Sequence, residues 1–275
     1  MSSARDSRTA ATADEVRTMA KYAGVDLSKH NDKVDYAKLA KAKIKGKTVK
    51  FAMLRLGFGC SKDILFDRHY AGCKAAGLKV GVYVWSRARN AAEARQEALW
   101  ALEQIKGLDI AYPVAMDFED EEILGLKLSR EQYTAIVRTF LSTIKNANYY
   151  PILYIGKYVL ADNIDGNILN DYDIWLAQYT TEGRQAQLGQ TMWQFGIAGH
   201  DLWDYSNVGS VDGVTGQCDY NWSYVGYAAK IKKLGMNKPK IKYKIVGEKT
   251  VEAADLAKVQ GQLKALGFSV TTEEI

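Results

Sequence analysis

Apolar residues recur along the chain in two spacings, and each spacing predicts a kind of element. Short apolar runs predict buried strands at 51–59, 79–85, 111–119, 150–156, 172–179 and 191–196. Apolar residues three to four positions apart predict helices at 65–77, 91–107 and 129–147. Gly77 is placed to end the first helix, and Ser129 with Gln132 to form a capping box at the last. Strands that alternate with helices predict an α/β protein built on a parallel sheet or barrel.

The predicted strand at 111–119 ends in an unusual amount of negative charge, in the stretch "YPVAMDFEDEEI". Asp117 and Glu119 are two positions apart, so on a strand their side chains share a face. In parallel barrels the active site gathers at the carboxyl ends of the strands, where this pair lies. Burial and the acidic residues 120–122 would raise the pKa of Glu119 toward the range of a general acid. The alternative is an acidic loop in contact with solvent.

The composition is that of a globular protein with room for one large domain and a small appendage. The chain has 275 residues, of which 47% are hydrophobic and 25% charged, and this excludes the disordered and collagen-like classes. No apolar run approaches the length of a membrane span, and the first twenty residues lack the apolar region of a secretory signal. We therefore expect no membrane insertion and no signal peptide.

Cysteine and histidine spacing predicts no metal and no cofactor. The cysteines are too few for a disulfide framework and too widely spaced for a zinc site, so we expect them reduced. No short ligand spacing joins the histidines. The residues concerned are Cys60, Cys73, Cys218, His30, His69 and His200. No Gly-rich phosphate loop or aromatic and basic motif indicates a nucleotide or nucleic acid.

Positive charge concentrates at the end of the chain. Lysines outnumber acidic residues by five in 230–275, which accounts for the whole formal charge of +5. We interpret 228–240 as a basic linker and 241–275 as a small strand, helix and strand module. Such a βαβ unit is too small to be stable alone, so it would dock on the large domain or pair with a second copy as a homodimer. The positive charge of the tail as a whole, 230–275, suits an anionic surface such as a cell wall, and a merely solvated tail is the alternative.

Five motifs occur in a fixed order along the chain. They are "GVDLSKHN" (24–31), "MDFED" (116–120), "DIWLAQY" (173–179), "MWQFG" (192–196) and "VDGVTGQCDYN" (211–221). This set resembles the glycoside hydrolase family 25 lysozymes, which include the muramidases of phage endolysins and bacterial autolysins. The resemblance covers about residues 22–224 and implies a catalytic domain at 22–227, preceded by an extension at 1–21. It implies a TIM-like (β/α)5(β)3 barrel that cleaves the β-1,4 bond between N-acetylmuramic acid and N-acetylglucosamine in peptidoglycan.

The resemblance assigns roles to four carboxyl groups. The family's acid falls on Glu119 and its companion carboxylate on Asp117, while the aspartates of the first and last motifs fall on Asp26 and Asp219. Asp117 would orient the substrate's 2-acetamido group, or act directly as base or nucleophile; the resemblance favours the substrate-assisted route with retention. Asp26 and Asp219 would position the substrate and tune the pKa values of Glu119 and Asp117. The alternative for these two is a loop aspartate that caps backbone amides.

Other residues are expected to contact the sugar. Tyr83, Tyr154 and Trp175 end or nearly end predicted strands, where family members place residues that stack on sugar rings. Arg55 and Gln178 would hydrogen-bond hydroxyl or acetamido groups. Two departures from the family pattern concern substrate detail: His30 and Asn31 in the first motif, and a long segment at 197–210.

Together these features predict a cell-wall muramidase of the phage endolysin type. It would act at the bacterial cell wall, after release through a holin-type membrane lesion or an unrecognised export route. One alternative is a barrel that binds peptidoglycan without turnover. Another is a chitinase-like hydrolase of N-acetylglucosamine polymers.

Overall fold

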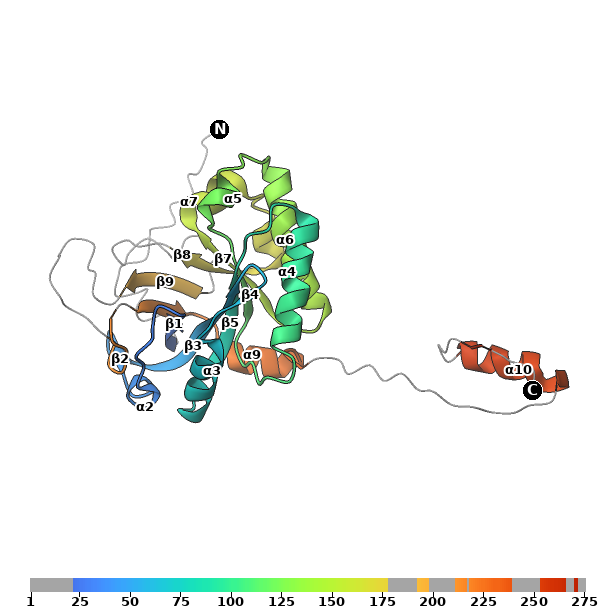
Figure 1. Ribbon diagram of the computed structural model, residues 1–275, viewed down its shortest axis with the longest axis horizontal. Coiled ribbons are helices and arrows are strands. Elements are labelled where there is room, and N and C mark those ends of the chain that lie inside the picture. The colour runs from blue at the N-terminus through green and yellow to red at the C-terminus, as the bar shows by residue number, and fades with distance from the viewer. Residues whose placement is uncertain are drawn as a thin grey trace, which may run out of the picture. The chain divides into compact units, whose positions relative to one another are not determined.

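The computed structural model describes residues 22–177, 192–197, 211–216, 218–238, 253–265 and 270–271. The chain divides into two compact units, Met1–Lys240 and Ile241–Ile275. The extension expected at 1–21 lies outside the described residues. The described part of the first unit is a mixed α/β fold with a curled sheet (Figure 1).

Strands of the curled sheet pair in an order that brings its first and last members together. The strands are β1 (Tyr22–Leu27), β3 (Lys47–Phe58), β5 (Lys79–Trp85), β6 (Val114–Asp117), β7 (Pro151–Gly156), β8 (Asp173–Ala177), β9 (Met192–Ile197) and β10 (Asp219–Ser223). Successive strands from β1 to β9 pair in parallel. β10 runs antiparallel to both β9 and β1. Two short strands, β2 (Lys43–Ile44) and β4 (Ser61–Lys62), form hairpins on β3.

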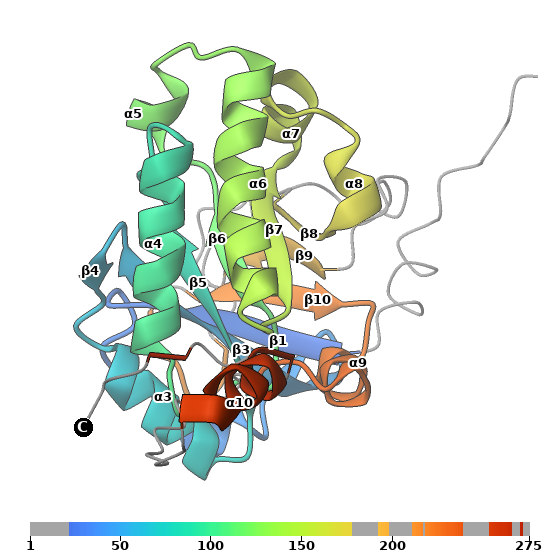
Figure 2. The same ribbon diagram turned by 90° about the vertical axis from the view of Figure 1, so that its right-hand side faces the viewer.

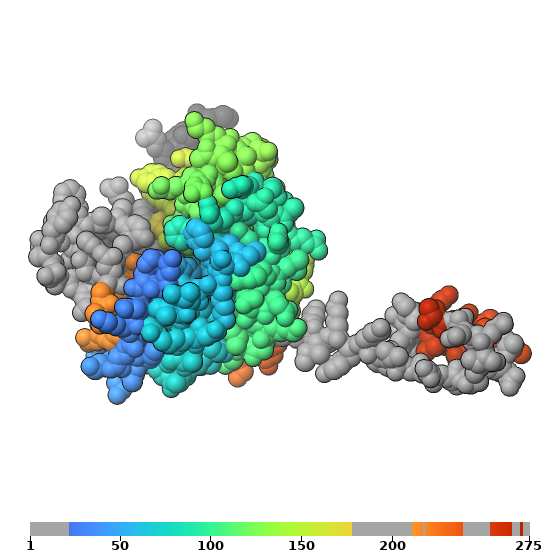
Figure 3. All heavy atoms as spheres, viewed as in Figure 1, coloured from blue at the N-terminus to red at the C-terminus, as the bar shows by residue number. Residues whose placement is uncertain are grey.

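Most helices pack on the outside of the sheet, and the last one packs at the ends of the strands. The elements are α2 (Tyr36–Leu39), α3 (Phe66–Ala75), α4 (Ala91–Gln104), α5 (Glu121–Leu124), α6 (Arg130–Asn146), α7 (Lys157–Asn163), α8 (Ile168–Asp171) and α9 (Tyr227–Leu234). α4 and α6 lie side by side (Figure 2). In the space-filling view, the strands and helices from the first half of the first unit form one continuous surface on the face shown (Figure 3). The capping box predicted at Ser129 and Gln132 is confirmed.

Both faces of the sheet are apolar, as expected for parallel strands covered on both sides. One core lies between the sheet and the outer helices. A second core lies on the concave face and contains Phe51, Met53, Tyr83, Tyr112, Ala115, Ile152, Tyr154, Trp175, Ala177, Tyr227 and Ile231. Gly24 is needed on this face, because a Cβ there would lie 2.4 Å from the ring of Phe51. The inner core therefore leaves little room except at the ends of the strands.

Residues 228–238 form a helix and turn instead of the expected linker. α9 buries Tyr227 and Ile231 in the inner core, and Gly235 ends the helix with φ +65°. Asp173, at the start of β8, accepts hydrogen bonds from Tyr227 Oη and Lys230 Nζ, both at 2.9 Å. α9 thus packs at the amino-terminal ends of the parallel strands. The lysines on its exposed side hide the four-residue spacing of its buried residues, and this is why the sequence pattern suggested a linker.

The turn after α9 is tied to the sheet by a buried asparagine. Asn237 Nδ2 donates to the carbonyl oxygens of Ile110 at 3.0 Å and Tyr112 at 2.8 Å. Its Oδ1 accepts from Tyr150 N at 2.7 Å. Two buried carbonyl groups and one partly buried N–H group therefore have this one side chain as a partner.

The second unit is described only in part. Its helix is α10 (Ala253–Ala265), within the segment where the sequence predicts a helix. Residues 270–271 have no regular structure, and the rest of the two expected strands lies outside the described residues. Among the described helices of both units, none is long and apolar enough to cross a membrane.

Substitution of Asn237 by Gly should destabilise the first unit. Asn237 has φ +57°, so Gly keeps the backbone and removes only the side chain. The loss of these three hydrogen bonds should lower the free energy of unfolding by about 3 kcal/mol, measured by urea denaturation. Lys127→Gly is the matched control, since Lys127 is exposed and has φ +51°. Equal effects of the two substitutions would contradict the role of the Asn237 side chain.

Candidate active site

Four carboxyl groups meet at one end of the curled sheet. Asp117 is the last residue of β6, and Glu119 follows it by two positions. Asp26 lies near the carboxyl end of β1. Asp219 begins β10, whose antiparallel direction brings its first residue opposite Asp26 in the strand register. The topology therefore places all four at the carboxyl ends of the parallel strands.

These carboxyl groups line one small cavity. Its volume is about 100 Å³, and its walls are formed by Asp26, Tyr83, Trp85, Asp117, Glu119, Tyr154, Trp175 and Asp219. The structure thus brings together the four predicted carboxyl residues and three of the five predicted substrate contacts. Trp85, the last residue of β5, also lines the cavity and was not among the predicted contacts. Its position at a strand end was the signal that could have found it.

Glu119 is protonated more readily than an exposed glutamate. Burial and then the charge of Asp26 raise its pKa to about 7, against a hydrogen bond with Tyr154 that lowers it. The rise in the pKa of Glu119 agrees with the prediction, but the acid that contributes to it is Asp26 and not residues 120–122. Asp120 instead caps α5, where its Oδ1 accepts from Glu122 N at 3.1 Å. A carboxyl group with a pKa near neutrality can act as a general acid.

Asp117 lies in the least solvated part of the cluster. Burial raises its pKa well above the ordinary value, with further contributions from the charges of Glu119 and Asp26, while Arg55 acts in the opposite direction. Its Oδ1 is buried and has no hydrogen-bond partner among the residues that the structure describes. A buried oxygen without a partner is costly, so this atom is suited to accept a hydrogen bond from a ligand.

Asp26 and Asp219 form a coupled pair. Burial and the neighbouring Asp26 raise the pKa of Asp219 to about 9. Asn221 Nδ2 donates to Asp26 Oδ2 at 2.9 Å, and Asn221 Oδ1 accepts from Trp175 Nε1 at 2.8 Å. Asn221 thus fixes both a carboxylate and a cavity wall, a role that sequence reasoning missed although the residue lies in the last motif. At neutral pH the pair is expected to share one proton and one negative charge.

Most aromatic residues of the cavity are buried and form its walls, so their ring faces are not open to a ligand. Trp175 is 1% exposed and meets the rings of Tyr83 and Tyr154 edge-on, at centroid distances of 5.9 and 4.7 Å. Trp85 is more accessible and lies 5.9 Å from the ring of Phe58. Of these aromatic residues, Trp85 offers the more open ring face to a ligand.

The two remaining predicted contacts do not line the cavity as described. Arg55 is buried and donates from Nε to Asp63 Oδ2 at 2.7 Å. Gln178 lies outside the described residues. Asp63 is a further charged residue that sequence reasoning did not single out.

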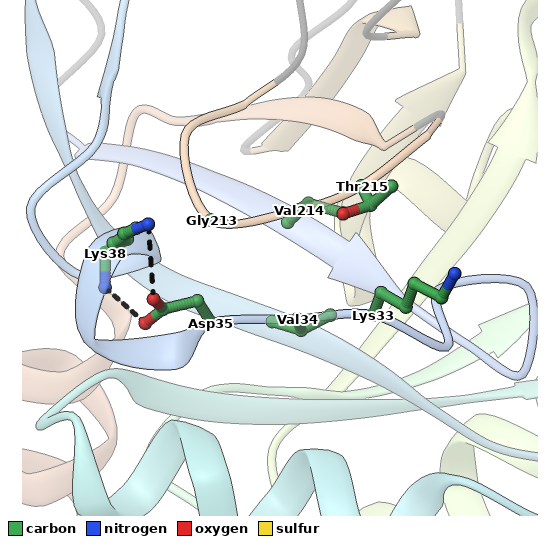
Figure 4. A pocket seen from close by; sticks show the side chains of 7 residues that line it. All are labelled: Lys33, Val34, Asp35, Lys38, Gly213, Val214 and Thr215. Carbon is green, nitrogen blue, oxygen red and sulfur yellow. Dashed lines mark hydrogen bonds and ion pairs between the residues drawn. The ribbon is translucent and has the colours of Figure 1, made fainter.

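A second hollow is shallow and shares no lining residue with the carboxyl cavity (Figure 4). Its volume is about 410 Å³, and it is lined by Lys33, Val34, Asp35, Lys38, Gly213, Val214 and Thr215. Asp35 caps α2 and lies 3.7 Å from Lys38 Nζ. Its charged groups are exposed and partly paired with each other, so it has no buried polar group directed at a ligand. Within the described ranges, no group of side chains could hold a metal ion.

Comparison with known proteins identifies the family. The sequence model of Glycosyl hydrolases family 25 matches residues 25–214, a range that includes Asp26, Asp117 and Glu119. The chain belongs to this family. It is therefore a glycoside hydrolase, and the predicted family membership is confirmed.

Relatives of this family 25 enzyme include lysozymes. The autolytic lysozyme of Clostridium acetobutylicum is 27% identical over 157 residues, which cover 57% of this chain and 43% of that protein. The bacterial lysozyme from Streptomyces coelicolor has a TM-score of 0.60 and 19% identity, covering 78% of this chain and 97% of that one. The CTP1L endolysin has a TM-score of 0.63 and 20% identity, covering 90% and 80%. The structural likenesses show that the mixed α/β fold is shared with these proteins.

Titration of Glu119 tests whether the Asp26 and Asp219 pair carries one charge in this family 25 enzyme. In Asp26→Asn or Asp219→Asn the remaining aspartate can ionise, so the pKa of Glu119 should stay near 7. In the double variant the charge is lost, and the pKa should fall by about one unit. Carbon-13 NMR of labelled glutamate carboxyls measures this. An unchanged titration in the double variant would show that burial alone raises the pKa.

Proposed function

We propose that this glycoside hydrolase is a lysozyme that cleaves the β-1,4 bond between N-acetylmuramic acid and N-acetylglucosamine in peptidoglycan. The observation that carries the proposal is the pair of Glu119 and Asp117 in one cavity, the first with a pKa raised to about 7. Glycoside cleavage needs a protonated carboxyl group beside the leaving oxygen and a second carboxyl group nearby. Lysozymes among the relatives support the choice of substrate.

Glu119 is assigned as the general acid. It donates its proton to the glycosidic oxygen as the bond to the anomeric carbon breaks, and the leaving sugar departs as an alcohol. The substrate's own 2-acetamido oxygen attacks the anomeric carbon from the other side. Glu119, now a carboxylate, then accepts a proton from the water that opens this intermediate. Two displacements at one carbon retain its configuration.

Asp117 is assigned to the acetamido group. Its Oδ1 has no hydrogen-bond partner among the described residues and can accept the acetamido N–H. As the acetamido oxygen attacks, positive charge develops on the amide. This charge, with that of Arg55, favours the ionised form of Asp117 against the burial that raises its pKa, and the carboxylate in turn stabilises the amide. Asp26 and Asp219 are assigned to positioning, since Asn221 and the strand register hold them beside the pair.

The curled sheet is proposed to be the (β/α)5(β)3 barrel of the family. The pairing of β1 with both β3 and β10 supports this, because it leaves β1 with a partner at each edge. In this arrangement Tyr83, Tyr154 and Trp175 shape the sugar site and Trp85 offers a ring face. Gln178, which follows β8 directly, remains a predicted sugar contact.

Two other functions give different products. A barrel that binds peptidoglycan without turnover would release no new chain ends. A chitinase-like enzyme would cleave polymers of N-acetylglucosamine. The raised pKa of Glu119 favours turnover, because a binding site gains nothing from a titrating acid.

Glu119→Gln should lower turnover of peptidoglycan by about 10²- to 10⁴-fold, because Gln cannot donate the proton. The products are reduced with borohydride and identified by mass spectrometry. New muramitol ends from the wild type alone are expected. Glu121→Gln is the matched control, since Glu121 is an exposed acid in the same segment and should keep its activity. Glucosaminitol ends, or no new ends from the wild type, would contradict the proposed function.

The second unit is proposed to bind the cell wall, where the enzyme acts. Wall-active relatives support this site of action. The unit has as many acidic residues as lysines, so its net charge does not carry the proposal. Release through a holin-type lesion, as for a phage endolysin, and a homodimer through this unit stay predictions. Light scattering of the full chain tests the dimer.

Deletion of residues 241–275 should weaken sedimentation with intact cell walls several-fold. Hydrolysis of soluble fragments should be unchanged. The cut lies after Lys240 because the Lys238 carbonyl accepts from Asn148 Nδ2 at 2.7 Å and belongs to the first unit. Binding equal to that of the full chain would refute a wall-binding role.

A further inference from the structure

A buried ion pair lies next to the carboxyl cluster without lining its cavity. Arg55 Nε donates to Asp63 Oδ2 at 2.7 Å, and the two side chains are 9% and 1% exposed. A buried ion pair contributes little net stability, because both charges lose their hydration. Its presence beside an active site therefore calls for another explanation.

Asp63 joins three parts of the fold. Besides Arg55 on β3, its Oδ2 accepts from Lys29 N at 3.0 Å, in the turn that follows Asp26. Its Oδ1 accepts from Leu65 N at 2.9 Å, just before α3. Burial alone would raise the pKa of Asp63, but these backbone and guanidinium hydrogen bonds lower it overall. Asp63 is thus an anion held by three donors.

The turn after Asp26 has a second support on the same side. His69 Nε2 donates to the Ser28 carbonyl oxygen at 3.0 Å, and Tyr36 Oη donates to His69 Nδ1 at 2.9 Å. Asn31 Oδ1 accepts from Ser28 N at 2.9 Å. The turn whose Lys29 N–H binds Asp63 is therefore itself held in place, and this restricts the position of the Asp63 carboxylate.

Arg55 lies on β3, on the other side of β5 from Asp117. It is the register partner of Tyr83, a wall of the cavity. Burial raises the pKa of both Asp117 and Tyr83 well above the ordinary value, and the positive charge of Arg55 opposes this rise. The other titratable groups around Asp117 and Tyr83 are acidic or phenolic: Asp26, Glu119, Asp120, Asp219 and Tyr154. Arg55 is the cation in this set.

We propose that Asp63 is a positioning residue that holds the Arg55 guanidinium beside Tyr83, where its charge favours the ionised form of Asp117 and leaves the proton on Glu119. This inference rests on the proposed function. It assigns Arg55 to the charge balance of the site in place of the sugar contact expected from sequence. Two carboxyl groups with opposite protonation are what glycoside cleavage requires.

The test is the pH dependence of kcat/KM on soluble peptidoglycan fragments. The acid limb of the profile reports the ionisation of Asp117, and the basic limb reports Glu119. Loss of a nearby cation makes Asp117 harder to ionise. Arg55→Gln should therefore move the acid limb up by about one pH unit. Arg55→Lys keeps the charge and should leave the limb within a few tenths of a unit, whatever it does to kcat.

Asp63→Asn separates positioning from charge. If Asp63 holds Arg55 in place, loss of the carboxylate lets Arg55 shift away, and the acid limb moves up as in Arg55→Gln. The double variant with Asp63→Asn and Arg55→Gln should then show no further shift. If Arg55 stays, loss of the negative charge moves the limb down. A downward or absent shift overturns the inference. Asp67→Asn is the control, because Asp67 is exposed, pairs with Lys62 and should leave the limb in place.

Failure of the proposed function can be told apart from failure of this inference. If the wild type releases no new chain ends, the proposed function fails, and carbon-13 NMR titration of Asp117 in the wild type and Arg55→Gln still tests the inference. If the wild type is active and no limb moves, the inference alone fails. Should Asp63→Asn not fold by circular dichroism, the comparison of Arg55→Gln with Arg55→Lys decides.

Discussion

Four carboxyl groups share a space that is too small and too dry for four negative charges, and this constraint governs the site. The cavity holds about 100 Å³, and the pKa values of Glu119 and Asp219 rise to about 7 and about 9. Protons must therefore be distributed over the cluster at neutral pH. Bringing such groups together costs folding free energy, and the rest of the first unit has to supply it. The gain is a proton available to donate at the pH where an exposed glutamate has lost it.

The first unit gains this free energy from two apolar cores and from α9, which packs at the amino-terminal ends of the parallel strands. Helices α3, α4 and α6 cover the outer face of the sheet, while aromatic and aliphatic side chains fill its concave face. α9 adds Tyr227 and Ile231 to the inner core, and Asn237 anchors the following turn. Because the strands are held at one end, the residues at their other end have defined positions. Asn221 illustrates the result, since one amide orients both Asp26 and Trp175.

Electrostatics differentiates carboxyl groups that are chemically alike. Asp120 follows Glu119 directly, yet it caps α5 and accepts from Trp85 Nε1 at 3.1 Å. Asp117 has an oxygen without a hydrogen-bond partner among the described residues, and the cation Arg55 lies two strands away on β3. Asp63, outside the cavity, is held as an anion by three donors. The role of each acid follows from which donors and charges surround it, and not from its distance along the chain to the next acid.

The sequence by itself determined the features that depend on local spacing. Apolar runs marked the strands, Ser129 and Gln132 marked the start of α6, and the two-residue spacing of Asp117 and Glu119 placed both acids at one strand end. The family motifs added Asp26 and Asp219. Tertiary structure alone decided which distant residues meet: the pairing of Asp26 with Asp219, the Arg55 ion pair with Asp63, and the packing of α9 where lysines suggested a linker. Strand order, burial and the charges across a cavity are set by contacts between segments far apart in the chain, and a one-dimensional pattern does not contain those distances.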